Sequence, residues 1–143
     1  MNTALQQQGT PEVRQTSVLV VDDEENFLNL TAMVLSREGY HVVTAGNGIH
    51  GLAHADREKF CVAILDINME PMMGIEVLAE LKKRDPMTQV VIVTGCQTEE
   101  TRNECVRLGA GAYLKKPIEM SELKAVLRAL LGGQLLQSIS PNA

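Results

Sequence analysis

Short runs of apolar residues recur along the chain at regular intervals. They lie at 18–21, 42–43, 62–65, 90–93 and 112–114. Several runs are continuous rather than alternating with polar residues, which is typical of parallel strands covered on both faces. The pattern therefore predicts five strands that belong to one buried sheet.

The segments between these runs place apolar residues at helical spacing. The clearest face is formed by Leu123, Val126, Leu127 and Leu130. Residues 98–108 form the weakest predicted helix, because they are mainly charged and offer little apolar face. Strands and helices that alternate in this way predict an α/β fold with a parallel sheet and right-handed crossovers.

The chain has 143 residues, which is enough for one domain with a single core. We assign 16–131 to this domain, 1–15 to a flexible N-terminal segment, and 132–143 to a C-terminal tail or linker that begins with two glycines. The first residues lack the features of a secretory signal, and no apolar run is long enough to cross a membrane. We therefore expect a cytoplasmic protein with no membrane contact.

Charge and cysteine content exclude several classes of site. The net charge is -5 and no block of basic residues occurs, so we expect no direct binding of nucleic acid. Cys61, Cys96 and Cys105 are odd in number and form no C-x-x-C pair, which favours free thiols. His50 and His54 lack a third ligand nearby, so we place them on the surface rather than at a metal.

Side chains capable of chemistry follow four of the predicted strands. In an open parallel sheet, ligands bind beyond the carboxyl ends of the strands. The residues at these ends are Asp22 and Asp23, then Asp66, then Thr94, and finally Lys115 and Lys116. An acidic pair after a strand is by itself more often the start of a helix. The ordered set, with each member at its own strand end, indicates a common site.

Adjacent carboxylates repel one another unless a cation lies between them. Mg²⁺ binds carboxylates, water and phosphate oxygens, so Asp22, Asp23 and Asp66 form a candidate site for Mg²⁺ or Mn²⁺. The Thr94 hydroxyl could donate to a phosphoryl group, and a lysine ammonium could neutralise its charge. A carboxylate beside such a metal can also act as a nucleophile and form an acyl phosphate.

These segments together resemble the receiver domain of bacterial two-component response regulators. The resemblance rests on Val-Asp-Asp at 21–23, Leu-Asp at 65–66, Val-Thr-Gly at 93–95 and Tyr-Leu-Lys-Lys-Pro at 113–117. It implies a single domain with a flavodoxin-like, doubly wound sheet of five parallel strands in the order 2-1-3-4-5, together with five helices.

The resemblance assigns roles to the residues at the aspartate cluster. Asp66 would be the phospho-acceptor. Asp23 would bind Mg²⁺ directly, and Asp22 would do so at least partly through water. Asn68 would add its backbone carbonyl to the metal ligands.

The resemblance also assigns roles at the fourth and fifth strands. Thr94 would bind the phosphoryl group together with Lys116, which is preferred over Lys115 because the family lysine directly precedes a proline. Tyr113 would be the switch aromatic, with a half-buried strand residue as the alternative. Pro117 would follow a cis peptide bond, which is uncommon even before proline.

The function implied is phosphorelay signalling. A sensor histidine kinase or phosphotransfer domain would phosphorylate Asp66 and thereby change the face formed by 98–108, 112–114 and the last helix. This face would act on an output domain or partner protein, and a phosphorylation-dependent homodimer through it is a further hypothesis. The protein would assist its own phosphorylation and dephosphorylation without being a turnover enzyme. A degenerate receiver, acting as a phosphorylation-independent interaction module, is the alternative.

The loop after Asp66 departs from the family pattern Asp-x-x-Met-Pro-x-x-Asp-Gly. Glu70 stands where the proline is usual, Pro71 follows one place later, and Met73 replaces the aspartate before glycine. Proline restricts its own conformation and that of its predecessor, so we expect a locally different loop path. Metal binding should survive, because Asp66 and Asn68 precede the change.

The same region contains residues whose role the sequence leaves open. Met69, Met72 and Met73 could form a soft apolar contact for a partner or fill the core under the loop. Cys96, two residues after Thr94, would border the site and affect the access of water.

Two other families with related chemistry fit the residues less well. A phosphatase of the haloacid dehalogenase type needs Asp-x-Asp after its first strand, where this chain has Asp22 and Asp23 in succession. A flavin carrier needs a hydroxyl-rich phosphate loop and stacking aromatics. This chain has acidic residues in that loop, no Trp, two Tyr and two Phe.

Overall fold

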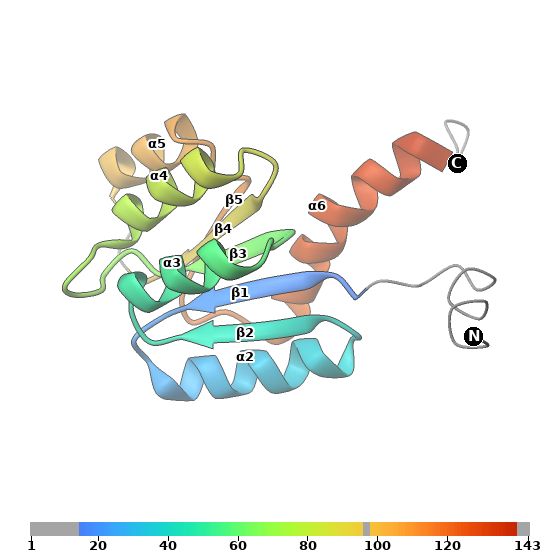
Figure 1. Cartoon of the computed structure of the whole chain (residues 1–143), viewed down its shortest axis with the longest axis horizontal. Helices are drawn as coiled ribbons and strands as arrows, with labels where there is room; N and C mark the ends of the chain where they lie inside the picture. Colours follow the sequence, from blue (N-terminus) through green and yellow to red (C-terminus); the bar gives the residue numbers. More distant parts are fainter. Residues whose placement is uncertain (1–14, 96–97, 140–143) are drawn as a thin grey trace.

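The computed structural model describes residues 15–95 and 98–139, with side chains described as far as residue 132. The predicted N-terminal segment, apart from Gln15, and Cys96 lie outside the described residues. The strands are β1 (Ser17–Val21), β2 (His41–Ala45), β3 (Val62–Leu65), β4 (Gln89–Thr94) and β5 (Ala112–Lys115). They form one parallel sheet in the order β2-β1-β3-β4-β5 (Figure 1). The predicted fold class and strand order are confirmed.

Helices cover both faces of the sheet. They are α2 (Glu25–Arg37), α3 (Gly48–Arg57), α4 (Gly74–Arg84), α5 (Glu99–Arg107) and α6 (Met120–Ile139). Leu19 and Val21 of β1 pack in the core with α3, α4 and α5, whereas Val18 and Val20 pack with α2 and α6. All four are fully buried, which explains why the strand is a continuous apolar run. α5 buries only Cys105, in agreement with its weak apolar face.

Local signals in the sequence mark several helix ends. The Asn47 side chain accepts a hydrogen bond of 2.9 Å from the backbone N–H of His50 at the start of α3. Gly39 and Gly109 follow α2 and α5 with φ values of 99° and 105°, a conformation that glycine adopts without a steric penalty.

The last helix extends past the boundary that we assigned to the domain. The assigned domain ends at 131, but α6 continues to Ile139. Each glycine at 132–133 costs a helix about 1 kcal/mol relative to alanine without excluding helical dihedral angles, and the Gln and Leu residues that follow are good helix formers. Most of the segment predicted as a tail is therefore helical. No helix within 15–95 or 98–139 combines the length and apolar content needed to cross a membrane.

Candidate functional site

Three aspartates meet at the carboxyl ends of two neighbouring strands. β1 and β3 are paired with Val21 opposite Leu65, so Asp22 and Asp66 leave the sheet side by side. Oxygens of Asp22, Asp23 and Asp66 all lie within 4.8 Å of one another. Asp22 and Asp66 are buried, whereas Asp23 is exposed. The structure therefore brings the three predicted metal ligands into one cluster.

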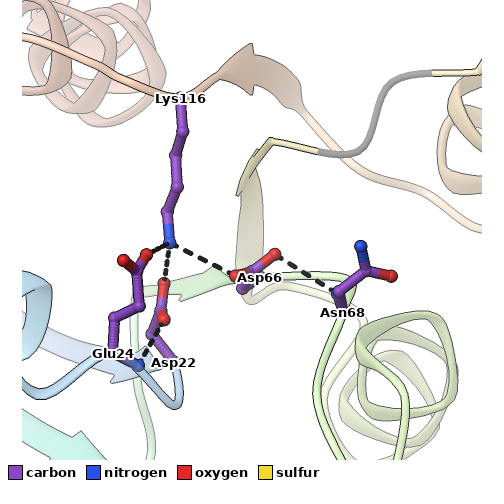
Figure 2. A network of polar contacts seen from close by, with 5 residues as sticks. All are labelled: Asp22, Glu24, Asp66, Asn68 and Lys116. Atoms are coloured by element: carbon purple, nitrogen blue, oxygen red, sulfur yellow. Dashed lines mark hydrogen bonds and ion pairs between the residues drawn. The ribbon is translucent and has the colours of Figure 1, made fainter.

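Lys116 extends from the end of β5 into this cluster (Figure 2). Its Nζ lies 2.7 Å from Asp22 Oδ2 and 3.2 Å from Asp66 Oδ2, and it also pairs with Glu24. The ammonium lies 4.6 Å from the centroid of the Phe27 ring, a cation–π distance. The peptide bond between Lys116 and Pro117 is cis.

Burial and charge act in opposite directions on the ionisable groups of the site. Burial raises the pKa of Asp22 above its usual value, although hydrogen bonds from Lys116 and from the backbone of Glu24 oppose this. Burial alone would lower the pKa of Lys116, but its hydrogen bonds to Asp22 and Glu24 and the charge of Asp66 raise it. Lys116 therefore stays protonated at neutral pH.

The loop that follows β3 holds Asp66 in place. The backbone N–H of Asn68 donates to Asp66 Oδ1 over 3.3 Å, and the N–H of Gly74 donates to the carbonyl of Ile67 over 2.9 Å. A Cβ atom at position 74 would lie 2.0 Å from the backbone oxygen of Asp66. Glycine is therefore required where α4 begins so close to the strand end.

Thr94 and Tyr113 lie on the two strands beyond β3. Thr94 ends β4 and is fully buried, and its carbonyl accepts a hydrogen bond of 2.9 Å from the backbone N–H of Lys116. Because β4 pairs with β3, Thr94 lies at the same edge of the sheet as Asp66. Tyr113 of β5 is half-buried and lines a hollow at the start of α5.

The structure places the departures from the family pattern beside the aspartates. The peptide bond between Glu70 and Pro71 is cis. Glu70 is exposed and lines a pocket together with Asp23, Asn68 and Met73. The backbone N–H of Asn68 still donates its hydrogen bond to Asp66 despite the altered loop.

The methionines of this loop differ in burial. Met69 is 2% exposed and belongs to the core on the side of α3, α4 and α5, and Met72 packs against the same core. Met73 is 41% exposed. Met69 and Met72 therefore fill the core, and Met73 alone of the three presents a large exposed surface.

Sequence reasoning gave no role to Glu24, which is one of three anionic partners that Lys116 has within the described part of the chain. The signal present in the sequence was its place directly after the two aspartates. Elsewhere, Cys61 and His50 are exposed and Cys105 is buried. Neither His50 nor His54 belongs to the carboxylate cluster.

Comparison with protein families and with curated proteins shows that this chain is similar to response regulators. The model of the response regulator receiver domain matches residues 18–128. The probable transcriptional regulatory protein TcrX of Mycobacterium tuberculosis is 36% identical over 115 residues, which cover 80% of this chain and 49% of that protein. The chain thus spans about half the length of some curated relatives and about a quarter of the length of others.

Solved structures agree with this result. A CheY-like response regulator receiver domain protein from Methanospirillum hungatei is 31% identical with a TM-score of 0.84, covering 87% of this chain and 99% of that one. A response regulator from Burkholderia pseudomallei is 29% identical with a TM-score of 0.76, covering 90% and 76% of the two chains. That structure contains a phosphorylated aspartic acid and a calcium ion.

Proposed function

Because the chain belongs to the response regulator receiver domain family, we propose that Asp66 is its phospho-acceptor. Receiver domains of two-component response regulators act in phosphorelay signalling, and this chain is such a domain. The observation that carries the proposal is the cluster itself, in which Asp66 lies beside two further aspartates and within 3.2 Å of Lys116 Nζ. The related protein from Burkholderia pseudomallei supports it, because it carries a phosphorylated aspartic acid.

The aspartate cluster fits a divalent cation. One oxygen from each of the three aspartates lies within 4.8 Å of the others, and carboxylate oxygens are the ligands that Mg²⁺ prefers. Asp22, Asp23 and Asp66, with the backbone carbonyl of Asn68, would hold Mg²⁺ or Mn²⁺. When bound, the cation would neutralise carboxylate charge that otherwise repels the incoming phosphoryl group.

Phosphorylation would proceed by direct displacement. A carboxylate oxygen of Asp66 attacks the phosphorus of a phosphohistidine in a sensor histidine kinase or phosphotransfer domain. The P–N bond breaks, its electron pair stays on the histidine nitrogen, and Asp66 becomes an acyl phosphate. Lys116 and Thr94 bind the phosphoryl oxygens. Water later attacks phosphorus, which releases inorganic phosphate and restores the carboxylate. We infer that the phosphorylated state is itself the signal, so the protein would act as a switch rather than as a turnover enzyme.

The output would be a change of the face formed by α5, β5 and α6. Thr94 moves toward the phosphoryl group and Tyr113 turns inward, which reshapes the start of α5. α5 is suited to such a change because it buries only Cys105. We place the protein in the cytoplasm, acting on an output domain or partner protein, with a phosphorylation-dependent homodimer as a further form.

The test is incubation with acetyl phosphate and Mg²⁺, followed by measurement of the intact mass. We expect one labile phosphoryl adduct on the wild-type protein and none after chelation of the metal or in Asp66→Ala. Asp56→Ala, which removes an exposed carboxylate on α3, should keep the adduct. An adduct that persists in Asp66→Ala would overturn the assignment, and turnover of many phosphate esters would indicate a phosphatase.

A further inference from the structure

The Lys116 ammonium is shared among three carboxylates. It has three N–H donors, and its Nζ lies 2.5 Å from Glu24 Oε1, 2.7 Å from Asp22 Oδ2 and 3.2 Å from Asp66 Oδ2. Figure 2 shows Glu24 and Asp66 on opposite sides of the ammonium. The contact with Asp66 is the longest of the three, so Lys116 is held more closely on the side of Glu24.

The start of α2 fixes the position of Glu24. The backbone N–H of Glu24 donates to Asp22 Oδ1 over 2.9 Å, and its carbonyl accepts from the N–H of Leu28 over 3.1 Å. The Phe27 ring, from the first turn of the same helix, lies against the ammonium. The beginning of α2 therefore supplies two groups, the Glu24 carboxylate and the Phe27 ring, that contact the Lys116 ammonium.

A phosphoryl group on Asp66 would require Lys116 to redirect at least one donor. Release from Asp22 would leave a buried carboxylate without its partner, which is costly. The Glu24 side chain is 62% exposed, so water can replace the lysine there at little cost. The contact with Glu24 is therefore the one that can open most readily.

We propose that Glu24 is a positioning residue that competes with the phosphoryl group for Lys116 and so limits how tightly the site holds that group. The inference rests on the proposed function, because it requires Asp66 to be the phospho-acceptor. It assigns opposite effects to the carboxylates around Lys116. Asp22 and Asp66 help to form the binding site, whereas Glu24 weakens the binding of the phosphoryl group.

The test compares two variants that change the net charge equally. Glu24→Gln removes the competing charge and keeps the shape of the side chain. Glu25→Gln is the matched control, since Glu25 is exposed and is not among the ion-pair partners of Lys116 within the described residues. Beryllofluoride, a mimic of the phosphoryl group, is titrated into each protein at saturating Mg²⁺, and its affinity is measured by calorimetry. Urea unfolding of each variant reports any change in fold stability.

We expect Glu24→Gln to bind beryllofluoride roughly threefold more tightly, in the range of an exposed ion pair, and Glu25→Gln to match the wild type. Both variants should unfold cooperatively in urea, which shows that a difference in affinity does not come from loss of the fold. Equal affinities in Glu24→Gln and Glu25→Gln, or weaker binding in Glu24→Gln alone, would overturn the inference while leaving Asp66 as acceptor. Failure of the wild-type protein to bind beryllofluoride with Mg²⁺ would instead overturn the proposed function, and the inference with it.

Discussion

Two ionic networks of this molecule differ in how their charges balance. Around Lys116, one ammonium contacts three carboxylates. Around Arg84, at the end of α4, two cations meet two anions, because Arg84 binds Asp56 and Glu80 while Lys83 also binds Glu80. The side chain of Lys116 is 14% exposed and that of Arg84 is 33% exposed. The first network is crowded with like charge and partly buried, whereas the second is balanced and open to water.

The difference separates a functional set of charges from a structural one. The Arg84 network joins α3 to α4, and the hydrogen bonds from Arg84 and Lys83 lower the pKa of Glu80. Burial instead raises the pKa of Asp22 in the Lys116 network. Carboxylates that are buried in excess of their counter-charges destabilise the fold unless a cation joins them. The excess of buried negative charge at this strand end is therefore the feature on which we base the proposed cation site.

The largest expected effect is that of Lys116→Met. This change removes the ammonium from among Asp22, Glu24 and Asp66 while keeping an apolar chain near Phe27. We expect the free energy of unfolding at pH 8 without metal to fall by roughly 3 kcal/mol, the scale for loss of one partner from a buried ion pair. Urea denaturation measures it. Added Mg²⁺ should recover part of the loss, and no recovery would contradict the view that a cation can replace the lysine.

Magnesium should stabilise the wild-type protein almost as strongly. At a free concentration one hundred times its dissociation constant, a ligand specific to the folded state adds about 2.7 kcal/mol to the free energy of unfolding. Urea denaturation with Mg²⁺ and with chelator measures this. Asp23→Asn, at the exposed member of the cluster, should lose most of the effect at the same concentration. Asp56→Asn, in the balanced network, should keep all of it, and an equal loss in both variants would point to unspecific binding.

The pH dependence of stability should differ in sign between the two networks. The folded-state pKa of Asp22 is raised above 3.8. The contribution of Asp22 to the free energy of unfolding is therefore complete below pH 3.8. This contribution is lost as pH rises through the folded-state pKa. In metal-free buffer, the stability of Asp22→Asn relative to wild type should increase from acidic to neutral pH.

Glu80 provides the contrast. The pKa of Glu80 is lowered from 4.5, so its contribution to the free energy of unfolding is present above pH 4.5. This contribution is lost as pH falls through the folded-state pKa. The stability of Glu80→Gln relative to wild type should therefore decrease from acidic to neutral pH. Urea denaturation at a series of pH values measures both differences. If the two stability differences changed with pH in the same direction, burial would not be what sets the pKa of Asp22 apart from that of Glu80.

The sequence was sufficient to predict most of the fold and the central residues of the cluster. The continuous run at 18–21 indicated a strand covered on both faces, and the structure buries all of it. The proximity of Asp22 and Asp66 could be predicted from the sequence, because the carboxyl ends of parallel strands meet at one edge of the sheet. Lys116 reaches the same edge from the end of β5.

Other features depend on backbone paths that a linear pattern does not contain. Glu24 and Glu25 are chemically equivalent in the sequence, and only the turn into α2 decides that Glu24 meets Lys116. Similarly, the path of the loop closed by Gly74 buries Met69 and exposes Met73. In each case, neighbouring residues of one type take different roles because of local geometry.

The smallest expected effect is that of Arg84→Met. Asp56 and Glu80 can turn to water when the guanidinium is removed, and the freed side chains regain conformational entropy. The urea midpoint should therefore fall by only a small fraction of the loss in Lys116→Met. The affinity for Mg²⁺ should not change, since α4 begins beside Asp66 and Arg84 is the last residue of this helix. A loss as large as that of Lys116→Met would mean that burial and charge excess do not set the two networks apart, and the argument from charge excess to a cation site would fail.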